Sequence, residues 1–176
     1  MEKDLPYTLL ALYFDNGIEY VNHLLADQFS KNHLGEVITI ARGRVGRSND
    51  QCHIEQKNNT FIRKILGYER IEKKEIVEAI NDLYINEWSQ LHNHFHCQLK
   101  LKEKDRIGSK TFRKFDQAKT PYQRLMESEH LSEEQKQKLK LKHESLNPID
   151  LHGQVQKKLA TIWKLIKSAE IGQKVA

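Results

Sequence analysis

Two acidic residues, Asp15 and Glu55, are the strongest candidates for chemistry in this sequence, and 39 residues separate them. Transfer of a polynucleotide strand by two metal ions needs carboxylates that hold a pair of Mg²⁺ ions about 4 Å apart, one activating the attacking oxygen and one stabilising the leaving oxygen. An Asp at the end of a strand, facing a Glu on a nearby helix, would form half of such a site. The same residues also fit a plainer interpretation, in which Asp15 forms a simple turn and Glu55 is a solvated helix residue.

The elements expected around Asp15 form an α/β unit. Residues 7–14 (YTLLALYF) are continuously apolar, which predicts a buried strand, and the strand stops at the turn signal Asp15-Asn16-Gly17. Apolar residues about four apart then predict a helix over 19–32, and residues 36–40 predict a second short strand. A strand, a helix and a strand in this order favour parallel pairing of the two strands.

Two more helices are expected before the sequence changes character. Residues 41–51 contain three arginines and two glycines and end in Ser48-Asn49-Asp50, which predicts a mobile loop closed by a helix cap. A helix over 53–66 should follow, carrying Glu55. A longer helix is predicted over 73–94, with one apolar face formed by Ile76, Ile80, Leu83, Tyr84, Trp88 and Leu91.

The residues around the two acids resemble those of DDE-type transposases and integrases of bacterial insertion sequences. Residues 14–22 (FDNGIEYVN) resemble the strand, turn and helix that present the second acid of the retroviral-integrase-like core. Residues 49–58 (NDQCHIEQKN) resemble the loop and helix start that carry the third. Residues 63–70 (RKILGYER), 119–125 (KTPYQRL) and 145–148 (SLNP) look like downstream stretches of one transposase group, so the resemblance covers nearly the whole chain.

This resemblance implies an RNase H-like fold, dependence on Mg²⁺ or Mn²⁺, and DNA strand cleavage and transfer at transposon ends. Asp15 and Glu55 would be the metal ligands, and Lys57 would lie near DNA phosphates. In that fold the first acid lies on a strand upstream of the one beginning at Tyr7. We therefore expect a truncated core that lacks the first catalytic Asp and is inactive as an isolated chain, unless a partner chain supplies the missing strand and acid.

The predicted organisation is an α/β fold with three parts. A partial RNase H-like core, with two remaining strands and their helices, should occupy 1–97, followed by a basic linker over 98–119 and an all-α region over 120–176. Thr120-Pro121 predicts the start of a short helix through Met126, Ser132 the cap of the next helix, and Pro148 the start of the last. The last helix has an apolar stripe, which predicts packing within this region or, alternatively, a dimer seam: Leu151, Val155, Leu159, Ile162, Ile166 and Ala169.

Positive charge is concentrated in one segment. The whole chain has a net charge of +5, whereas residues 98–124 alone hold nine Lys or Arg against three acids. A local excess of this kind suits contact with phosphates, and Phe112 and Phe115 between the charges favour nucleic acid over an ordinary solvated linker. The residues predicted to contact DNA are Lys57, Lys100, Lys102, Lys110, Arg113 and Lys114.

Histidines and cysteines offer two weaker candidates. His92, His94, His96 and Cys97 are zinc-ligand types, but alternate spacing on a helix separates them, so a helix end with exposed histidines is favoured. Cys52 and His53 resemble a nucleophile pair, but neighbouring helical residues face different directions.

The composition also bounds the compartment and the partners. The chain has two cysteines, which favours free thiols in a reducing cytoplasm, and its apolar run at 7–14 is too short to span a membrane. DNA, at transposon ends and target, is the expected partner, with a homo-oligomer or a complementing transposase chain as further partners. The alternative function is a non-catalytic DNA-binding or interaction protein that uses the basic C-terminal half.

Overall fold

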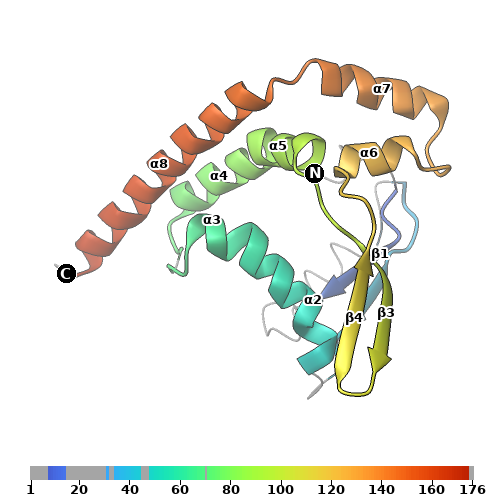
Figure 1. Ribbon diagram of the computed structural model, residues 1–176. Coiled ribbons are helices and arrows are strands. Elements are labelled where there is room, and N and C mark those ends of the chain that lie inside the picture. The colour runs from blue at the N-terminus through green and yellow to red at the C-terminus, as the bar shows by residue number, and fades with distance from the viewer. Residues whose placement is uncertain (1–7, 15–30, 32–33, 45–47, 70, 175–176) are drawn as a thin grey trace. The chain divides into compact units, whose positions relative to one another are not determined.

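The computed structural model describes residues 8–14, 31, 34–44, 48–69 and 71–174 (Figure 1). Within them the fold is mixed α/β, with several helices and two small two-stranded sheets. The chain divides into two compact units, Met1–Arg70 and Ile71–Ala176. None of the helices in the described ranges is long and apolar enough to cross a membrane.

The sheet of the first unit is a parallel pair, as the sequence predicted. Strand β1 (Ala11–Phe14) pairs with β2 (Thr39–Arg42), in register from Ala11↔Thr39 to Phe14↔Arg42. The second strand begins three residues later than the expected 36–40. The Gly43 N–H donates to the Phe14 carbonyl at 3.3 Å and extends the ladder past the end of both strands.

The expected burial of the first strand is wrong in its described part. Leu12 and Phe14 are half-buried, whereas Ala11 and Tyr13 are exposed. Successive side chains of a strand point to opposite faces, so only one face of this strand is covered. The predicted turn at 15–17 and the predicted helix over 19–32, apart from Lys31, lie outside the described residues.

A continuous helical stretch follows in the first unit. It consists of α2 (Ser48–Asn58), the π-helical η3 (Asn59–Arg63) and α3 (Lys64–Leu66), and it confirms the helix expected over 53–66. The helix begins at Ser48, five residues earlier than predicted. It ends at Gly67, whose φ of 77° lies in the region that glycine adopts without strain.

The core of the second unit lies between two long helical segments. The first comprises α4 (Lys74–Leu83), the π-helical η4 (Tyr84–Trp88) and α5 (Ser89–Phe95), and it confirms the helix predicted over 73–94. The second is α8 (Pro148–Lys174), which contacts all three. Buried side chains from both segments meet here: Ile76, Leu83, Leu91, Leu151, Val155, Ile162 and Ile166. The apolar stripe of α8 is therefore used for packing within this unit.

Two shorter helices begin at the predicted caps. Helix α6 (Pro121–Met126) has a capping box in which the Gln123 N–H donates to Thr120 Oγ1 and the Thr120 N–H donates to Gln123 Oε1. Helix α7 (Glu133–Glu144) repeats this arrangement with Ser132 and Gln135. Each box satisfies two backbone donors that the first helical turn would otherwise leave unpaired.

The basic segment is a β-hairpin, which corrects both the expected linker over 98–119 and the all-α description of the region after the core. Strand β3 (Leu101–Ile107) pairs antiparallel with β4 (Lys110–Phe115). The turn consists of Gly108, with φ of 63°, and Ser109. A Gly-Ser pair between two strands is a hairpin signal. It was not recognised in the sequence because the high charge of both strands made them look unlike strands.

Candidate functional site

Of the two predicted metal ligands, the structure describes one. Glu55 lies on α2 with its side chain exposed, and Asp15 lies outside the described residues. Asp15 directly follows Phe14, the last residue of β1, and α2 begins six residues after Arg42, the last residue of β2. Because β1 and β2 are parallel and in register, their last residues, Phe14 and Arg42, lie side by side at the same end of the sheet.

Two neighbours of Glu55 in the same motif, Lys57 and Cys52, also have exposed side chains. Lys57, predicted to lie near phosphates, is exposed, and its Nζ lies 5.1 Å from the centre of the Phe61 ring, a cation–π contact. Among the described residues, which do not include Asp15, no three His, Cys, Asp or Glu side chains lie close enough together to hold a metal ion.

The other predicted DNA contacts lie on or beside the β3–β4 hairpin. Lys100 precedes β3, Lys102 lies on it, and Lys110, Arg113 and Lys114 lie on β4, all with exposed side chains. Every residue of both strands is exposed, so neither face of this ribbon is covered by the rest of the second unit. A two-stranded hairpin alone is only marginally stable in water, so the contacts at its base are important.

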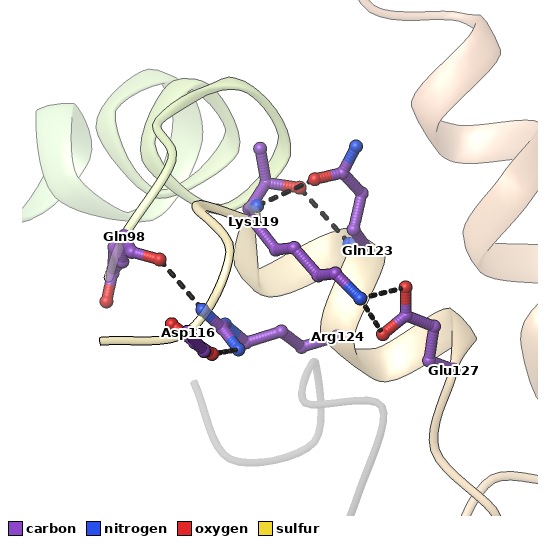
Figure 2. A network of polar contacts seen from close by, with 7 residues as sticks. Gln98, Asp116, Lys119, Gln123, Arg124 and Glu127 are labelled. Carbon is purple, nitrogen blue, oxygen red and sulfur yellow. Dashed lines mark hydrogen bonds and ion pairs between the residues drawn. The ribbon is translucent and has the colours of Figure 1, made fainter. Parts of the chain in front are cut away.

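An ion pair joins the base of the hairpin to α6 (Figure 2). Arg124 Nη1 donates to Asp116 Oδ2 at 2.6 Å, and Arg124 Nη2 donates to the Gln98 backbone carbonyl at 2.8 Å. The other Asp116 oxygen accepts the Lys100 N–H at 2.7 Å, and the Gln98 and Lys119 backbones bond to each other. The side chains of Asp116 and Arg124 are 14% and 19% exposed, so this is a partly buried pair. These contacts join segments that are apart in the sequence, so no local motif predicts them.

The charges of this pair reinforce each other. The hydrogen bond from Arg124, followed by the one from the Lys100 backbone, lowers the pKa of Asp116 to about 2. The hydrogen bond from Asp116 in turn raises the pKa of Arg124. Both side chains are therefore charged across the whole physiological range.

A cluster of rings joins α5, α6 and α7. His94 Nδ1 lies 3.2 Å from His143 Nδ1, and the Tyr122 ring stacks on the His143 ring with centroids 4.1 Å apart. His94 is only 6% exposed, so the expectation of exposed histidines at this helix end is wrong for His94. His92 instead contacts His96, with 3.3 Å between their Nδ1 atoms, whereas His94 contacts His143 of α7. The spacing therefore separates His94 from this pair, but it does not separate His92 from His96.

Burial, followed by electrostatic repulsion from His143 and Lys142, lowers the pKa of His94 to about 4. Both of these residues belong to α7. His94 is thus neutral in the folded protein at neutral pH.

Comparison with known proteins adds one relative. No protein-family model and no solved structure matches the chain. An uncharacterized protein of Sinorhizobium fredii, y4rM, is 32% identical over 111 residues, which make up 62% of this chain and 30% of y4rM. The chain therefore corresponds to less than a third of that protein, whose name states no activity.

The Asp116–Arg124 pair should make stability depend on acid pH. Because the pKa of Asp116 is lowered on folding, its contribution is present above the ordinary pKa of 3.8 and is lost as pH falls towards 2. Asp116→Asn should therefore unfold at lower urea than wild type at pH 6, and this gap should narrow between pH 4 and 2. Asp105→Asn, an exposed carboxylate on β3, is the control and should remain close to wild type. A constant gap for Asp116→Asn would contradict this account.

His94 should control stability at mildly acidic pH. With its pKa lowered from 6.5 to about 4, the unfolded chain gains a proton first, so stability is lost as pH falls from 6.5 to 4. Between pH 7.5 and 5, protonation of His94 in the unfolded chain should lower the free energy of unfolding by about 2 kcal/mol, and His94→Gln should remove that decrease. His152→Gln, at an exposed position of α8, should retain it. Parallel pH profiles of unfolding free energy for wild type and His94→Gln would refute the assignment.

Proposed function

We propose that this chain is part of a DDE-type transposase or integrase, with a catalytic core of RNase H-like fold that acts on DNA. Support comes from the resemblance of the motifs around Asp15 and Glu55, and from one structural observation that fits it. The parallel pair β1–β2 is followed by α2, so Asp15 comes directly after one strand and Glu55 lies on the helix after its neighbour.

The chemistry of the two side chains fits a divalent ion. Carboxylate oxygens are the ligands that Mg²⁺ and Mn²⁺ prefer, and Asp15 and Glu55 would hold the metal. When bound, the metal would activate the attacking oxygen and stabilise the leaving oxygen during DNA strand cleavage and transfer. A complete site of this class takes a third carboxylate, which neither motif supplies. Asp15 and Glu55 by themselves are therefore expected to bind metal weakly.

A second candidate function is non-catalytic DNA binding through the basic C-terminal half. The observation that favours it is the exposed hairpin, where the cations Lys100, Lys102, Lys110, Arg113 and Lys114 are all accessible. The two functions are compatible in one chain, since a transposase also has to hold the DNA that it cuts.

Mn²⁺ binding tests the acidic pair directly. Electron paramagnetic resonance of free Mn²⁺, titrated with the chain, should show a binding site that Asp15→Ala and Glu55→Ala each weaken about tenfold or more. Glu75→Ala, which removes an exposed acid from the first turn of α4, is the matched control and should bind as wild type does. Equal Mn²⁺ affinity in all four proteins would contradict the metal-ligand roles and leave only the DNA-binding candidate.

A further inference from the structure

The strands of the hairpin sort their charges onto opposite faces. Residues paired across an antiparallel ladder share a face, and successive residues alternate. The pairs Lys104↔Arg113 and Arg106↔Thr111 therefore lie on one face. We call Lys104, Arg106 and Arg113 the cationic face, because none of the acids of β3 or β4 shares it.

The opposite face is electrically balanced. It has the pairs Glu103↔Lys114, Asp105↔Phe112 and Ile107↔Lys110, two acids against two cations. Lys114 Nζ lies 3.2 Å from Glu103 Oε2, so part of this charge is neutralised within the face. Apart from Lys102, which lies at the register irregularity between Leu101 and Glu103, the net positive charge of the two strands is thus on one side of the ribbon.

The cationic face has two like charges at paired positions. Lys104 and Arg113 are directly opposite each other, and like charges in this position destabilise a sheet. Phe115, 48% exposed, follows Arg113 by two residues and so adjoins the same face. A pair of facing cations beside an exposed aromatic ring, on a ribbon with no covered face, is suited to a polyanion that neutralises the charge and covers the ring.

The shape of the element narrows the choice of polyanion. The major groove of B-form DNA admits a two-stranded β-ribbon, whereas the major groove of duplex RNA is too deep and narrow for side chains to read. The Arg124 contacts fix the base of the ribbon, and its turn at Gly108-Ser109 is the far end. Arg106 Nε donates to the Gly108 carbonyl at 3.2 Å, which holds this cation near that end.

We propose that the β3–β4 hairpin lies in the major groove of duplex DNA and that Lys104, Arg106 and Arg113 contact its phosphates. This inference rests on the proposed function in taking DNA as the partner, but it uses neither Asp15 nor Glu55. It also revises the predicted contacts. Arg113 keeps its role, Lys104 and Arg106 join it, and Lys110 and Lys114 belong to the balanced face.

Two double variants of the full chain test the assignment, since each removes two positive charges from the same hairpin. Lys104→Gln/Arg113→Gln should weaken binding to a fluorescent duplex of about 20 base pairs roughly tenfold, measured by anisotropy. Its slope of log affinity against log salt should fall by about 2. Lys110→Gln/Lys114→Gln should change the affinity less than threefold or so. Duplex RNA of equal length should compete less well than duplex DNA.

Thermal unfolding provides a check on folding. Because Lys104 and Arg113 repel each other, their double variant should unfold at the same temperature as wild type or higher. A lower unfolding temperature would contradict the proposed repulsion.

Several outcomes would overturn the inference. Equal loss of DNA affinity in both double variants would show that net charge alone matters, and equal competition by duplex RNA would exclude the major-groove placement. Binding of wild type to anionic vesicles without binding to DNA would identify a membrane surface instead. Failure here leaves the Mn²⁺ result untouched, so it is distinguishable from failure of the acidic pair.

Discussion

The guanidinium of Arg124 is the contact on which the arrangement of the basic hairpin depends. It bonds both to the Asp116 carboxylate, just after β4, and to the Gln98 carbonyl, before β3. A single planar group therefore holds the two strands together at the base of the ribbon. A lysine has one point charge and could not make both bonds with this geometry. The capping box of Thr120 fixes the first turn of α6 and thereby the position of Arg124. The hairpin has no buried face of its own, so these polar contacts replace a hydrophobic core.

The two units are suited to different tasks. In the proposed function, the first unit supplies the carboxylates: Asp15 directly follows β1, and Glu55 lies on α2. The second combines a helical core between α4, α5 and α8 with a charged ribbon outside that core. In the proposed transposase or integrase, metal-dependent chemistry and the holding of DNA would thus belong to separate elements.

Sequence reasoning succeeded where one local signal determines the structure. The helix caps at Thr120 and Ser132, the apolar stripe of α8 and the parallel strand pair were all predictable, because each follows from spacing or turn chemistry. It failed for the hairpin, because a strand is recognised from alternating apolar and polar residues, and both faces of these strands carry charged residues. The ion pair of Asp116 with Arg124 and the burial of His94 arise from contacts between distant segments, which no local pattern records. Asp15 is supported by its motif alone.

Hydrogen exchange of the full chain, with and without duplex DNA, tests the central claim most directly. A ribbon that lies in the groove loses solvent access along both strands, so its backbone amides should exchange more slowly when DNA is bound. The account predicts that the strongest protection on adding DNA falls within residues 101–115, with little change in α4 and α8. Protection concentrated in α7 or α8, with residues 101–115 unchanged, would contradict it.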